Sequence, residues 1–459
     1  MIDFNINRDK NLHIHFVGIG GISMSGLAEI LLHYGYSVSG SDSRASKMTD
    51  SLAKKGAVIS IGHAAKNVEN ADIVVYTAAV KWDNPELIRA KELGLKIVSR
   101  AEFLGQIMKH YKYGVAVAGT HGKTTTTSLI AIIMKNANLD PTVMVGGEVD
   151  AIGGNVRAGK SSYFVTEACE YVESFLKLYP YAGIVLNIDA DHLDFYKDIN
   201  QIINSFSKFI SLIPQDGYLI TCADNENAMK AAKNAKTNVI TFALKNKADW
   251  TASNITYDHN SCGQFDVYHR GNFFGSFKLN IPGKHNISNA LCAIACSQIF
   301  NIDISTIKKS FLEFFGTHRR FEKLGSFNGV TVIDDYAHHP TEIKATLSAA
   351  RNYPHKKLWC IFQPHTFSRT IKLLDGFSKA FDDTDALIVT DIYAAREKDT
   401  GEINSKMLAD KIKQNGVDAV YIQSFDDIAD YIRKNTSPGD VVITMGAGDV
   451  YKVAEKLLK

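Results

Sequence analysis

The chain lacks most of the features that mark membrane-spanning, secreted or nucleic-acid-binding proteins. None of its apolar runs approaches the roughly 20 residues that a helix needs to cross a bilayer. Residues 1–16 (MIDFNINRDKNLHIHF) contain no apolar core of the kind found in secretory signals. A formal net charge of +2 on 459 residues provides no general field that would attract nucleic acid or a membrane surface. We therefore expect a cytoplasmic protein with neither kind of partner.

Cysteine is also scarce, and its pattern argues against disulfides and structural zinc. The six cysteines form no C-x-x-C pair, and Cys292 and Cys296 lie one helical turn apart, as thiols packed in a core do. A reducing compartment fits this usage. Internal repeats and low-complexity segments are absent, and 45% hydrophobic with 22% charged residues is typical of a globular chain. A chain of this length predicts about three domains.

The stretch AGTHGKTTTT at residues 118–127 is the most informative part of the chain. It follows the apolar run 113–119, which predicts a buried strand, and precedes SLIAIIMKNA, which has helical spacing of apolar residues. A strand, a glycine-rich turn ending in Gly-Lys-Thr and a helix form the context of a phosphate-binding loop. The sequence therefore predicts a nucleotide-phosphate site here.

Each residue type in this loop has a physical role in binding phosphate. Gly119 and Gly122 let backbone N–H groups close around phosphate oxygens, and the helix that follows points its positive end at the same anion. Lys123 can reach the β- and γ-phosphates, and the Thr124 hydroxyl can bind Mg²⁺. The loop is one residue tighter than the usual pattern, because Val117 stands where a glycine is expected. The alternative is an ordinary glycine-rich turn with a surface lysine.

The first hundred residues predict a parallel sheet that binds a nucleotide diphosphate. Strands are expected at 12–18, 37–42, 71–77 and 96–99, alternating with helices. Gly18 and Gly20 fit a dinucleotide-binding turn, although Ser23 stands at its third glycine position, and Asp42 follows at the distance of a ribose ligand. Residues 77–80 (TAAV) end a strand, where such sheets bind ligands. His63 and Arg100 are weaker candidates, with ordinary exposed side chains as the alternative.

Acids and a histidine follow two strands expected at 163–168 and 182–189, in the second unit. Oxygen-rich side chains just past strand ends suit Mg²⁺, which takes few protein ligands. The alternative is helix capping, for which aspartate is favoured. We prefer a metal role for Glu167 and His192 and leave both readings open for Asp189 and Asp194. The polar residues at these two strand ends are Glu167, Asn187, Asp189, Asp191, His192 and Asp194.

Residues 249–282 predict a β-hairpin insertion around Gly271, because short alternating stretches flank it. A helix is expected after the Pro282-Gly283 turn, with His285, Asn286 and Asn289 near its start. Asparagine side chains there suit the edge of an adenine, and equally suit N-capping.

A third unit begins near residue 316 and carries polar residues at four expected strand ends. Strands are expected in GVTVIDDYAHHPTEI, LWCIFQPHTFSRT, ALIVTDIYAAREKDTG and VVITMGAGD. Polar residues at four strand ends indicate one open sheet with a binding site along one edge. Four such loops are hard to explain by the stability of the fold alone. The residues that stand out are Arg319, Arg320, His365, Arg369, Tyr393, Arg396, Gly446 and Gly448.

With these pieces placed, the chain resembles the Mur ligases, the ATP-driven amide ligases of peptidoglycan synthesis, over essentially its whole length. The motifs that carry the resemblance are GIGGISMSG, AGTHGKTTTT, EACEY, NIDADHLD, PGKHNISNA, HRRFE, DDYAHHPTE, QPHTFSRT and MGAGD. Within the family it is most similar to members that join L-alanine to the carboxylate of UDP-N-acetylmuramate through an acyl phosphate. The resemblance implies ATP and two Mg²⁺ ions, with Mn²⁺ as an alternative, in a monomer or homodimer.

The resemblance also implies three α/β domains, at 1–112, 113–316 and 317–459. The first is a Rossmann-like parallel sheet for the UDP-sugar, the second an ATP-binding mononucleotide fold, and the third a Rossmann-like domain that contacts the amino acid and closes over the second. UDP, rather than NAD, is then the ligand of the first domain. The residues implied to bind it are Gly18, Gly20, Gly21, Asp42, Thr77 and Ala78.

Site roles in the other two domains are likewise implied residue by residue. Lys123, His192, Arg320 and His338 are implied to be catalytic, with His338 positioning the incoming amine or accepting its proton. The implied ATP residues are Gly119, Thr120, His121, Gly122, Lys123, Thr124, Thr125, Asn286, Asn289, Arg320 and Asp334. The implied metal ligands are Thr124, Glu167 and His192, and the implied amino-acid residues are Tyr336, His338, His365 and Arg369.

Two positions depart from the family pattern. Some members carry a second arginine directly after the histidine of the Q-P-H loop, where this chain has Thr366, so Arg369 is expected to hold the amino-acid carboxylate largely alone. Sister ligases use a carbamylated lysine as a metal ligand near this register, but Lys208 is one residue out of place and is expected to be a surface lysine.

Three other functions remain as alternatives. A redox enzyme using NAD in the first unit leaves the phosphate loop and the expected metal residues unexplained. A nucleotide-binding regulatory protein leaves the polar loops of the third unit unexplained. The ligase that recycles whole tripeptides is the nearest neighbour within the family.

Overall fold

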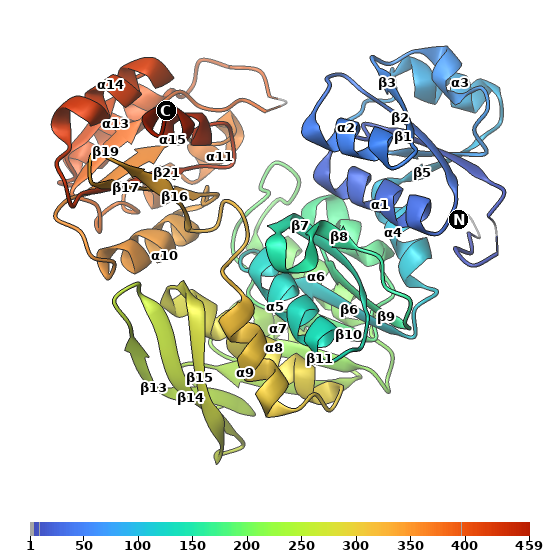
Figure 1. Cartoon of the computed structure of the whole chain (residues 1–459), viewed down its shortest axis with the longest axis horizontal. Coiled ribbons are helices and arrows are strands. Elements are labelled where there is room, and N and C mark those ends of the chain that lie inside the picture. The colour runs from blue at the N-terminus through green and yellow to red at the C-terminus, as the bar shows by residue number, and fades with distance from the viewer. Residues whose placement is uncertain (1–3, 9, 396) are drawn as a thin grey trace. The chain divides into compact units, whose positions relative to one another are not determined.

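A computed structural model describes residues 4–8, 10–395 and 397–459 of the chain. It contains three sheets, each accompanied by helices, which confirms the predicted α/β class (Figure 1). Within the described residues, no helix has both the length and the apolar character required to cross a membrane. By its internal contacts the chain divides into two compact units. The first contains the residues up to Ile188, Ile203–Phe242 and Cys292–Ile307, and the second contains Asp189–Ile202, Ala243–Leu291 and Lys308–Lys459.

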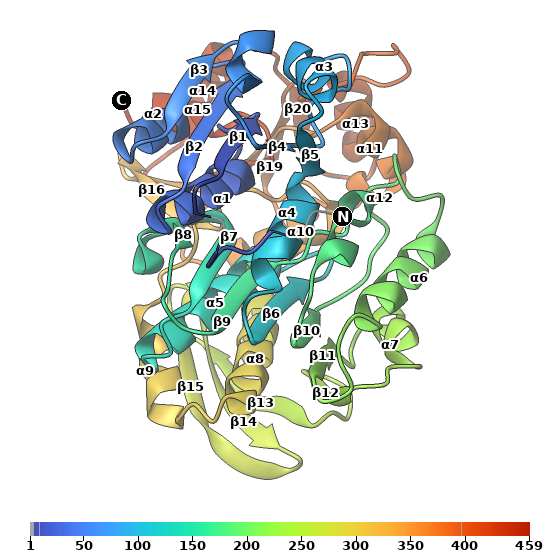
Figure 2. The ribbon, with the colours of Figure 1, turned by 90° about the vertical axis from the view of Figure 1, so that its right-hand side faces the viewer.

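The N-terminal sheet of the first unit is entirely parallel, in the order β3-β2-β1-β4-β5. Figure 2 shows its strands in the blue part of the ribbon. Its strands are β1 (His13–Val17), β2 (Ser37–Asp42), β3 (Val58–Ile61), β4 (Ile73–Tyr76) and β5 (Lys96–Ser99). Its helices are α1 (Ile22–His33), α2 (Lys47–Lys54), η1 (Ala65–Val68), α3 (Pro85–Glu92) and α4 (Arg100–Met108).

Four of these strands were predicted and β3 was not. β3 lies at the edge of the sheet, where Val58 is 68% exposed and Ile61 is 56% exposed. An edge strand buries little on either face, so it lacks the alternation by which strands are recognised. Along the chain, strands β2 and β3 are added on one side of β1, and β4 and β5 are then added on its other side, so the strand order reverses between β1 and β4. Ligands of open α/β sheets bind at such a reversal, beyond the carboxyl ends of the strands.

The seven strands of the ten-stranded second sheet that lie in the first unit run in the order β12-β11-β10-β6-β9-β7-β8. Among these strands only β8 is antiparallel to its neighbour. Strands β7 to β9 lie on one side of β6 and strands β10 to β12 on the other, so the strand order reverses at β6. Its strands are β6 (Tyr113–Ala118), β7 (Thr142–Val149), β8 (Gly154–Arg157), β9 (Tyr163–Glu167), β10 (Ala182–Val185), β11 (Tyr218–Cys222) and β12 (Asn238–Ala243). The helices between them are α5 (Lys123–Asn136), η2 (Asp150–Ile152), η3 (Tyr171–Lys177), α6 (Ile199–Ile210) and α7 (Glu226–Ala232).

The predicted hairpin is present in the second unit and has a third strand. Strands β13 (Trp250–Tyr257), β14 (Cys262–His269) and β15 (Asn272–Pro282) pair in antiparallel fashion. His269 pairs with Asn272, and both residues between them have positive φ, 50° at Arg270 and 81° at Gly271. This is a two-residue type I′ turn, whose twist matches that of the flanking strands. Helices α8 (Lys284–Ile299) and α9 (Ile304–Glu313) follow.

The C-terminal sheet, in the second unit, has the order β16-β17-β21-β18-β19-β20, with β16 antiparallel and the others parallel. Both of its faces are buried, as expected of a parallel sheet covered by helices, since Ile333 and Val332 pack into different apolar clusters. The strands are β16 (Glu322–Phe327), β17 (Val330–Asp335), β18 (Leu358–Phe362), β19 (Ala386–Val389), β20 (Ala419–Tyr421) and β21 (Val441–Met445). The helices are α10 (Pro340–Arg351), α11 (Phe367–Lys372), α12 (Leu374–Phe377), α13 (Ser405–Gln414), α14 (Phe425–Asn435) and α15 (Tyr451–Leu457).

Candidate active site

The glycine-rich turn after β1 is held by the ends of its neighbouring strands. Gly20 N–H donates to the Asp42 carboxylate over 2.9 Å. Gly18 has φ of +86°, and a Cβ there would lie 2.7 Å from Cγ2 of Thr77. Gly21 precedes the first residue of α1, and no side chain caps that helix. The predicted UDP-sugar residues therefore gather at one edge of the sheet, around a helix N-terminus whose N–H groups suit an anion.

The phosphate loop after β6 has the predicted strand–turn–helix form. Gly122 precedes the first residue of α5 with φ of 84°, and Gly119 has φ of +145°. A Cβ on Gly119 would lie 3.0 Å from Cβ of Leu186. Both glycines are therefore required by the backbone path. The loop lies between the ends of β9 and β10, the strands that flank β6.

Asn187 fixes the shape of this loop. Its Oδ1 accepts the N–H of His121 over 2.8 Å, and its Nδ2 donates to the His121 carbonyl over 3.0 Å. The backbone carbonyl of Asn187 accepts the N–H of Thr120 over 3.1 Å. One asparagine at the end of β10 thus holds two consecutive loop residues, which explains the polar residue that the sequence places there.

Lys123 is tied to its own loop and to one acid. Its ammonium donates to the carbonyls of Gly119 and Thr120, and lies 2.9 Å from the Glu170 carboxylate. The lysine side chain is 16% exposed and the glutamate side chain 3% exposed. Burial alone would lower the pKa of Lys123, but the charge of Glu170 outweighs it and raises that pKa above its ordinary value.

Two of the three predicted metal ligands lie on neighbouring elements of the first unit. Glu167 ends β9, in register with Val117 of β6, and Thr124 lies in the first turn of α5. The Glu167 carboxylate is partly exposed and accepts the N–H of Gly146 over 2.6 Å. A carboxylate and a hydroxyl are hard oxygen ligands of the type that Mg²⁺ prefers. The third, His192, belongs to the second unit and has a left-handed backbone with φ of 52°.

The asparagines of α8 do not cap the helix. α8 begins at Lys284, and Asn286 donates from Nδ2 to the Pro282 carbonyl over 2.7 Å, while its Oδ1 accepts from Asn289 over 3.0 Å. Both are 7% exposed. Of the two predicted roles, N-capping is therefore not the one that these side chains serve. Likewise no helix begins directly after Asp189 or Asp194, because α6 starts at Ile199.

Asp334 is buried in the C-terminal sheet and its carboxylate is already bonded within the protein. Its oxygens accept from Arg319 Nε over 2.9 Å and from Thr444 Oγ1 over 2.6 Å. Burial raises the pKa of Asp334 above its usual value, and the Arg319 charge acts against that rise. Arg319 and Arg320 both place their guanidinium groups 5.0 Å from the ring centroid of Tyr336. A bound ribose would have to share Asp334 with these partners.

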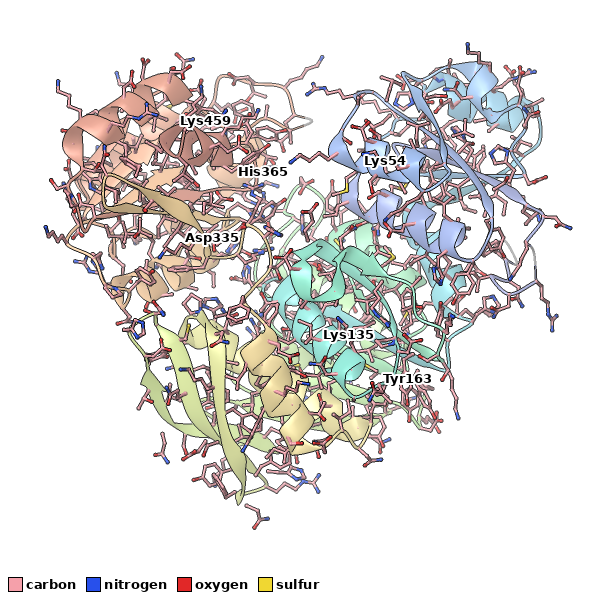
Figure 3. The ribbon with its side chains drawn as sticks, viewed as in Figure 1. Lys54, Lys135, Tyr163, Asp335, His365 and Lys459 are labelled. Atoms are coloured by element: carbon pink, nitrogen blue, oxygen red, sulfur yellow. The ribbon has the colours of Figure 1, made fainter. Side chains whose placement is uncertain are left out.

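Aromatic and imidazole rings line the carboxyl edge of the C-terminal sheet. The ring centroids of Tyr336 and His338 are 5.4 Å apart, those of His338 and His365 are 5.9 Å apart, and those of His365 and Tyr393 are 5.6 Å apart. Figure 3 labels Asp335 and His365 on the C-terminal part of the ribbon. Asp335 ends β17 and burial raises its pKa to about 6. These rings come from three loops distant in sequence, and Gly448 of the fourth predicted loop lies against Tyr393, where a Cβ would be 2.7 Å from Cγ of the ring. Arg396, also expected in this region, lies outside the described residues.

Arg369 pairs with an acid that the sequence analysis did not connect to it. Its guanidinium lies 3.0 Å from Asp191 Oδ1, and its NH1 lies 3.2 Å from His365 Nδ1. Both charged side chains are about one-tenth exposed. Burial would raise the pKa of Asp191, but the charge of Arg369 holds it well below its usual range. Together with His192 and Lys372 these residues line a pocket of the second unit.

His338 is held as a neutral ring. Its Nδ1 lies 2.9 Å from the Tyr336 carbonyl, which orients it. Burial lowers the pKa of His338 to about 4, with Glu342 raising it and Arg369 lowering it. With Nδ1 directed at a carbonyl, Nε2 is the nitrogen that can accept a hydrogen bond.

Three family profiles match the chain, together over most of its length. The Mur ligase family catalytic domain matches residues 13–112, the Mur ligase middle domain matches residues 117–297, and the Mur ligase glutamate ligase domain matches residues 319–448. A UDP-N-acetylmuramate–L-alanine ligase of Caldanaerobacter subterraneus subsp. tengcongensis is 57% identical over 454 residues, which cover 99% of each chain.

The chain belongs to the Mur ligase family.

Solved structures of Mur ligases share the fold of this chain. The UDP-N-acetylmuramate–alanine ligase MurC of Thermotoga maritima has a TM-score of 0.84 at 31% identity, over 98% of both chains. A murein peptide ligase of Psychrobacter arcticus has a TM-score of 0.73 at 27% identity, also over 98% of both chains. The fold class predicted from the sequence is therefore confirmed, as is the resemblance to Mur ligases.

Some residues of this Mur ligase site had no recognised role in the sequence analysis. Glu170, the partner of Lys123, stands in the EACEY motif but was not singled out. Asp191 was noted only as one of several acids after a strand. In both cases the residue type and place were visible, but the cation that each one pairs with lies 47 or 178 positions away.

The two departures from the family pattern have clear structural settings. Lys208 is 53% exposed and pairs with Glu173 over 3.2 Å, the surface position expected for it. Thr366 has φ of 68° and ψ of 143°, a backbone region that a β-branched residue rarely adopts. Its N–H donates to the Tyr393 carbonyl over 2.9 Å, so the ring cluster helps to hold this conformation.

Proposed function

We propose that this Mur ligase joins L-alanine to the carboxylate of UDP-N-acetylmuramate at the expense of ATP, releasing ADP and phosphate. The observation that carries the proposal is the phosphate loop: Gly119, Gly122 and Lys123 lie between the ends of β9 and β10 with α5 directed at the same point. The 57% identity to a relative of that name over nearly the whole chain supports the choice of substrates.

The UDP end of the substrate is assigned to the N-terminal sheet. Gly18, Gly20, Gly21, Asp42, Thr77 and Ala78 lie at the carboxyl ends of β1, β2 and β4 and would surround the nucleotide diphosphate. The Asp42 carboxylate already accepts the Gly20 N–H, so its role includes shaping the turn as well as meeting a ribose. The nucleotide diphosphate and the ribose that these residues would contact are present in UDP as well as in NAD, so nothing in this arrangement favours NAD over UDP.

Phosphoryl transfer is assigned to the phosphate loop and Arg320. The substrate carboxylate attacks the γ-phosphorus, ADP leaves, and an acyl phosphate forms. Both reactants are anionic, so Lys123 and Arg320 act mainly by neutralising charge and fixing position. Lys123 must turn from Glu170 and its own loop carbonyls toward the nucleotide. Thr124, Glu167 and His192 would hold Mg²⁺ or Mn²⁺, which when bound would neutralise negative charge on the phosphates.

Amide formation is assigned to the ring cluster of the second unit. Arg369 would hold the amino-acid carboxylate, and Asp191 beside it would attract the ammonium. The two oppositely charged side chains thus match the two charges of a free amino acid. The ammonium loses one proton to solvent, the free amine attacks the acyl carbon, and the departing phosphate takes up the second proton as the amide forms. A pKa of about 4 makes His338 a poor base for an ammonium proton, so its role is to orient the amine through a hydrogen bond to its ring.

The proposal is tested by the variant Lys123→Ala, with Lys208→Ala as the matched control. Lys123→Ala should reduce ATP-dependent phosphate release in the presence of UDP-N-acetylmuramate and L-alanine by at least a hundredfold, because removing one preorganised charge costs several kcal/mol. Binding of UDP-N-acetylmuramate, measured by calorimetry on the same preparation, should be unchanged. Retained ligation in Lys123→Ala, or lost sugar-nucleotide binding alone, contradicts the assignment.

An amino-acid panel separates this function from that of the tripeptide-recycling relatives. L-Alanine, glycine, L-serine and a tripeptide are offered in turn in the phosphate-release assay. L-Alanine should give the highest kcat/KM, and preference for the tripeptide would assign the chain to the other branch of the family.

A further inference from the structure

A buried carboxylate on α3, near the carboxyl end of β2, takes no part in the chemistry above. Glu86, the second residue of α3, is completely buried. Burial alone would raise its pKa, but the neighbouring His15, Ser41 and Asn67 side chains favour the ionised form and lower it to about 2. A buried charge is costly unless its partners compensate it, so its position calls for a physical reason.

The Glu86 carboxylate joins three segments of the chain. Its Oε2 accepts from Ser41 Oγ over 2.6 Å and lies 3.1 Å from His63 Nδ1. Its Oε1 accepts from Asn67 Nδ2 and from the N–H of Ala64 over 3.4 Å. The segments are the end of β2, the loop after β3, and η1.

The His15 ring faces the Glu86 carboxylate without a direct hydrogen bond to it. It is 1% exposed, its Nδ1 lies 2.7 Å from Ser39 Oγ, and its Nε2 lies 3.9 Å from Glu86 Oε2. Within the part of the chain that the structure describes, that Nε2 has no hydrogen-bond partner. The carboxylate is therefore bonded on the side of Ser41 and His63 and faced by a second imidazole from β1.

The end of β2 connects this network to the glycine-rich turn. The Ser41 carbonyl accepts the N–H groups of Gly18 over 2.8 Å and Ile19 over 2.9 Å. The next residue, Asp42, accepts the Gly20 N–H on its carboxylate and the Gly62 N–H on its carbonyl. One strand end thus holds both loops at this edge, and Glu86 holds that strand end by the side chain of Ser41.

We propose that Glu86 is a positioning residue of the UDP-substrate site, acting through Ser41 and His63 on the two loops that receive the nucleotide diphosphate. The proposal rests on the function proposed above. A turn that binds an anion by its N–H groups gains affinity when those groups are already in place, because binding then loses no free energy to ordering them. The Glu86 carboxylate, buried and compensated, orders the turn without presenting its charge at the surface.

The variant Glu86→Gln tests the proposal, because it keeps the shape of the side chain, removes its charge and replaces one of its two accepting oxygens by an NH2 donor. The dissociation constant of UDP, measured by calorimetry, should rise at least tenfold, and the KM of the UDP-substrate should rise with kcat within twofold. The dissociation constant of a non-hydrolysable ATP analogue should stay within twofold. Glu102→Gln is the control, since Glu102 is bonded to Ser99 at the start of α4 and, among the residues that the structure describes, bonds to none of β2. It should leave UDP binding unchanged.

Ser41→Ala removes the link while leaving Glu86 in place, and it carries the test alone if Glu86→Gln does not fold. It should weaken UDP binding to a similar degree, and the double variant should lose little more than either single one, because both cut the same connection. Unchanged UDP affinity in a folded Glu86→Gln, or losses that simply add, would overturn the proposal. A wild-type protein that binds the ATP analogue but not UDP would refute the proposed function instead.

Discussion

The ammonium of Lys123 lies 2.9 Å from the carboxylate of Glu170, and the two side chains are 16% and 3% exposed. Three hydrogen-bond acceptors therefore surround the lysine: Glu170 and the carbonyls of Gly119 and Thr120. A nucleotide phosphate has to compete with all of them. Glu170 compensates the lysine charge in this arrangement, and it opposes the movement that the proposed chemistry needs.

Replacing Glu170 by Gln should destabilise the free protein and strengthen its response to nucleotide. Removing one partner of a buried ion pair costs about 3–5 kcal/mol, because the other charge remains buried. An ATP analogue would supply the missing negative charge, so the rise in melting temperature at saturating analogue should exceed that of the wild-type protein. Thermal unfolding with and without analogue measures both effects. Glu173→Gln, which removes the partly exposed partner of the surface residue Lys208, is the control and should change neither quantity appreciably. An unchanged melting temperature in Glu170→Gln would contradict the compensating role.

Local pattern was sufficient to predict the phosphate loop and the hairpin. The order of apolar strand, glycine turn and helix at residues 113–137 involves only neighbours in sequence, and so does the Arg270-Gly271 turn. Both glycines of the loop have the positive φ that their role requires. Local chemistry decides such features, so the sequence displays them directly.

Long-range pairs were not predictable in the same way. Arg369 and Asp191 are 178 positions apart, and Glu86 and Ser41 are 45 apart. Each residue alone has several ordinary explanations, and only the fold selects the partner. Edge strand β3 was missed for a related reason, since its exposed valine and isoleucine carry no burial pattern.

His338 should remain neutral throughout the pH range in which the enzyme is assayed. Its pKa of about 4 lies below the value of an exposed histidine, so the folded protein favours the neutral ring, and protonation begins only as the pH falls toward 4. Nuclear magnetic resonance of labelled histidine should place its titration below pH 5. Titration near pH 6.5 would show that burial does not control this ring.

The variant His338→Ala should then raise the KM for L-alanine about tenfold, because it removes an orienting hydrogen bond, while the KM values for ATP and UDP-N-acetylmuramate stay unchanged. The shape of the pH profile of kcat/KM between pH 6 and 8 should be the same in wild type and variant, since His338 does not titrate there. A profile that loses an ionisation near neutrality in the variant would restore His338 to the role of a base. Phosphate-release kinetics over this range provide the measurement.

Thr366 stores backbone strain beside the proposed amino-acid site. Its φ of 68° and ψ of 143° are readily adopted by glycine and cost other residues about 1–3 kcal/mol. Thr366→Gly should therefore raise the free energy of unfolding by about 1 kcal/mol, after the larger chain entropy of glycine is subtracted. Asn328→Gly is the control, because asparagine tolerates its φ of 45° and little strain is relieved there. Denaturant unfolding of both variants measures the difference. A loss of stability in Thr366→Gly would mean that the methyl and hydroxyl contacts of the threonine outweigh its backbone strain.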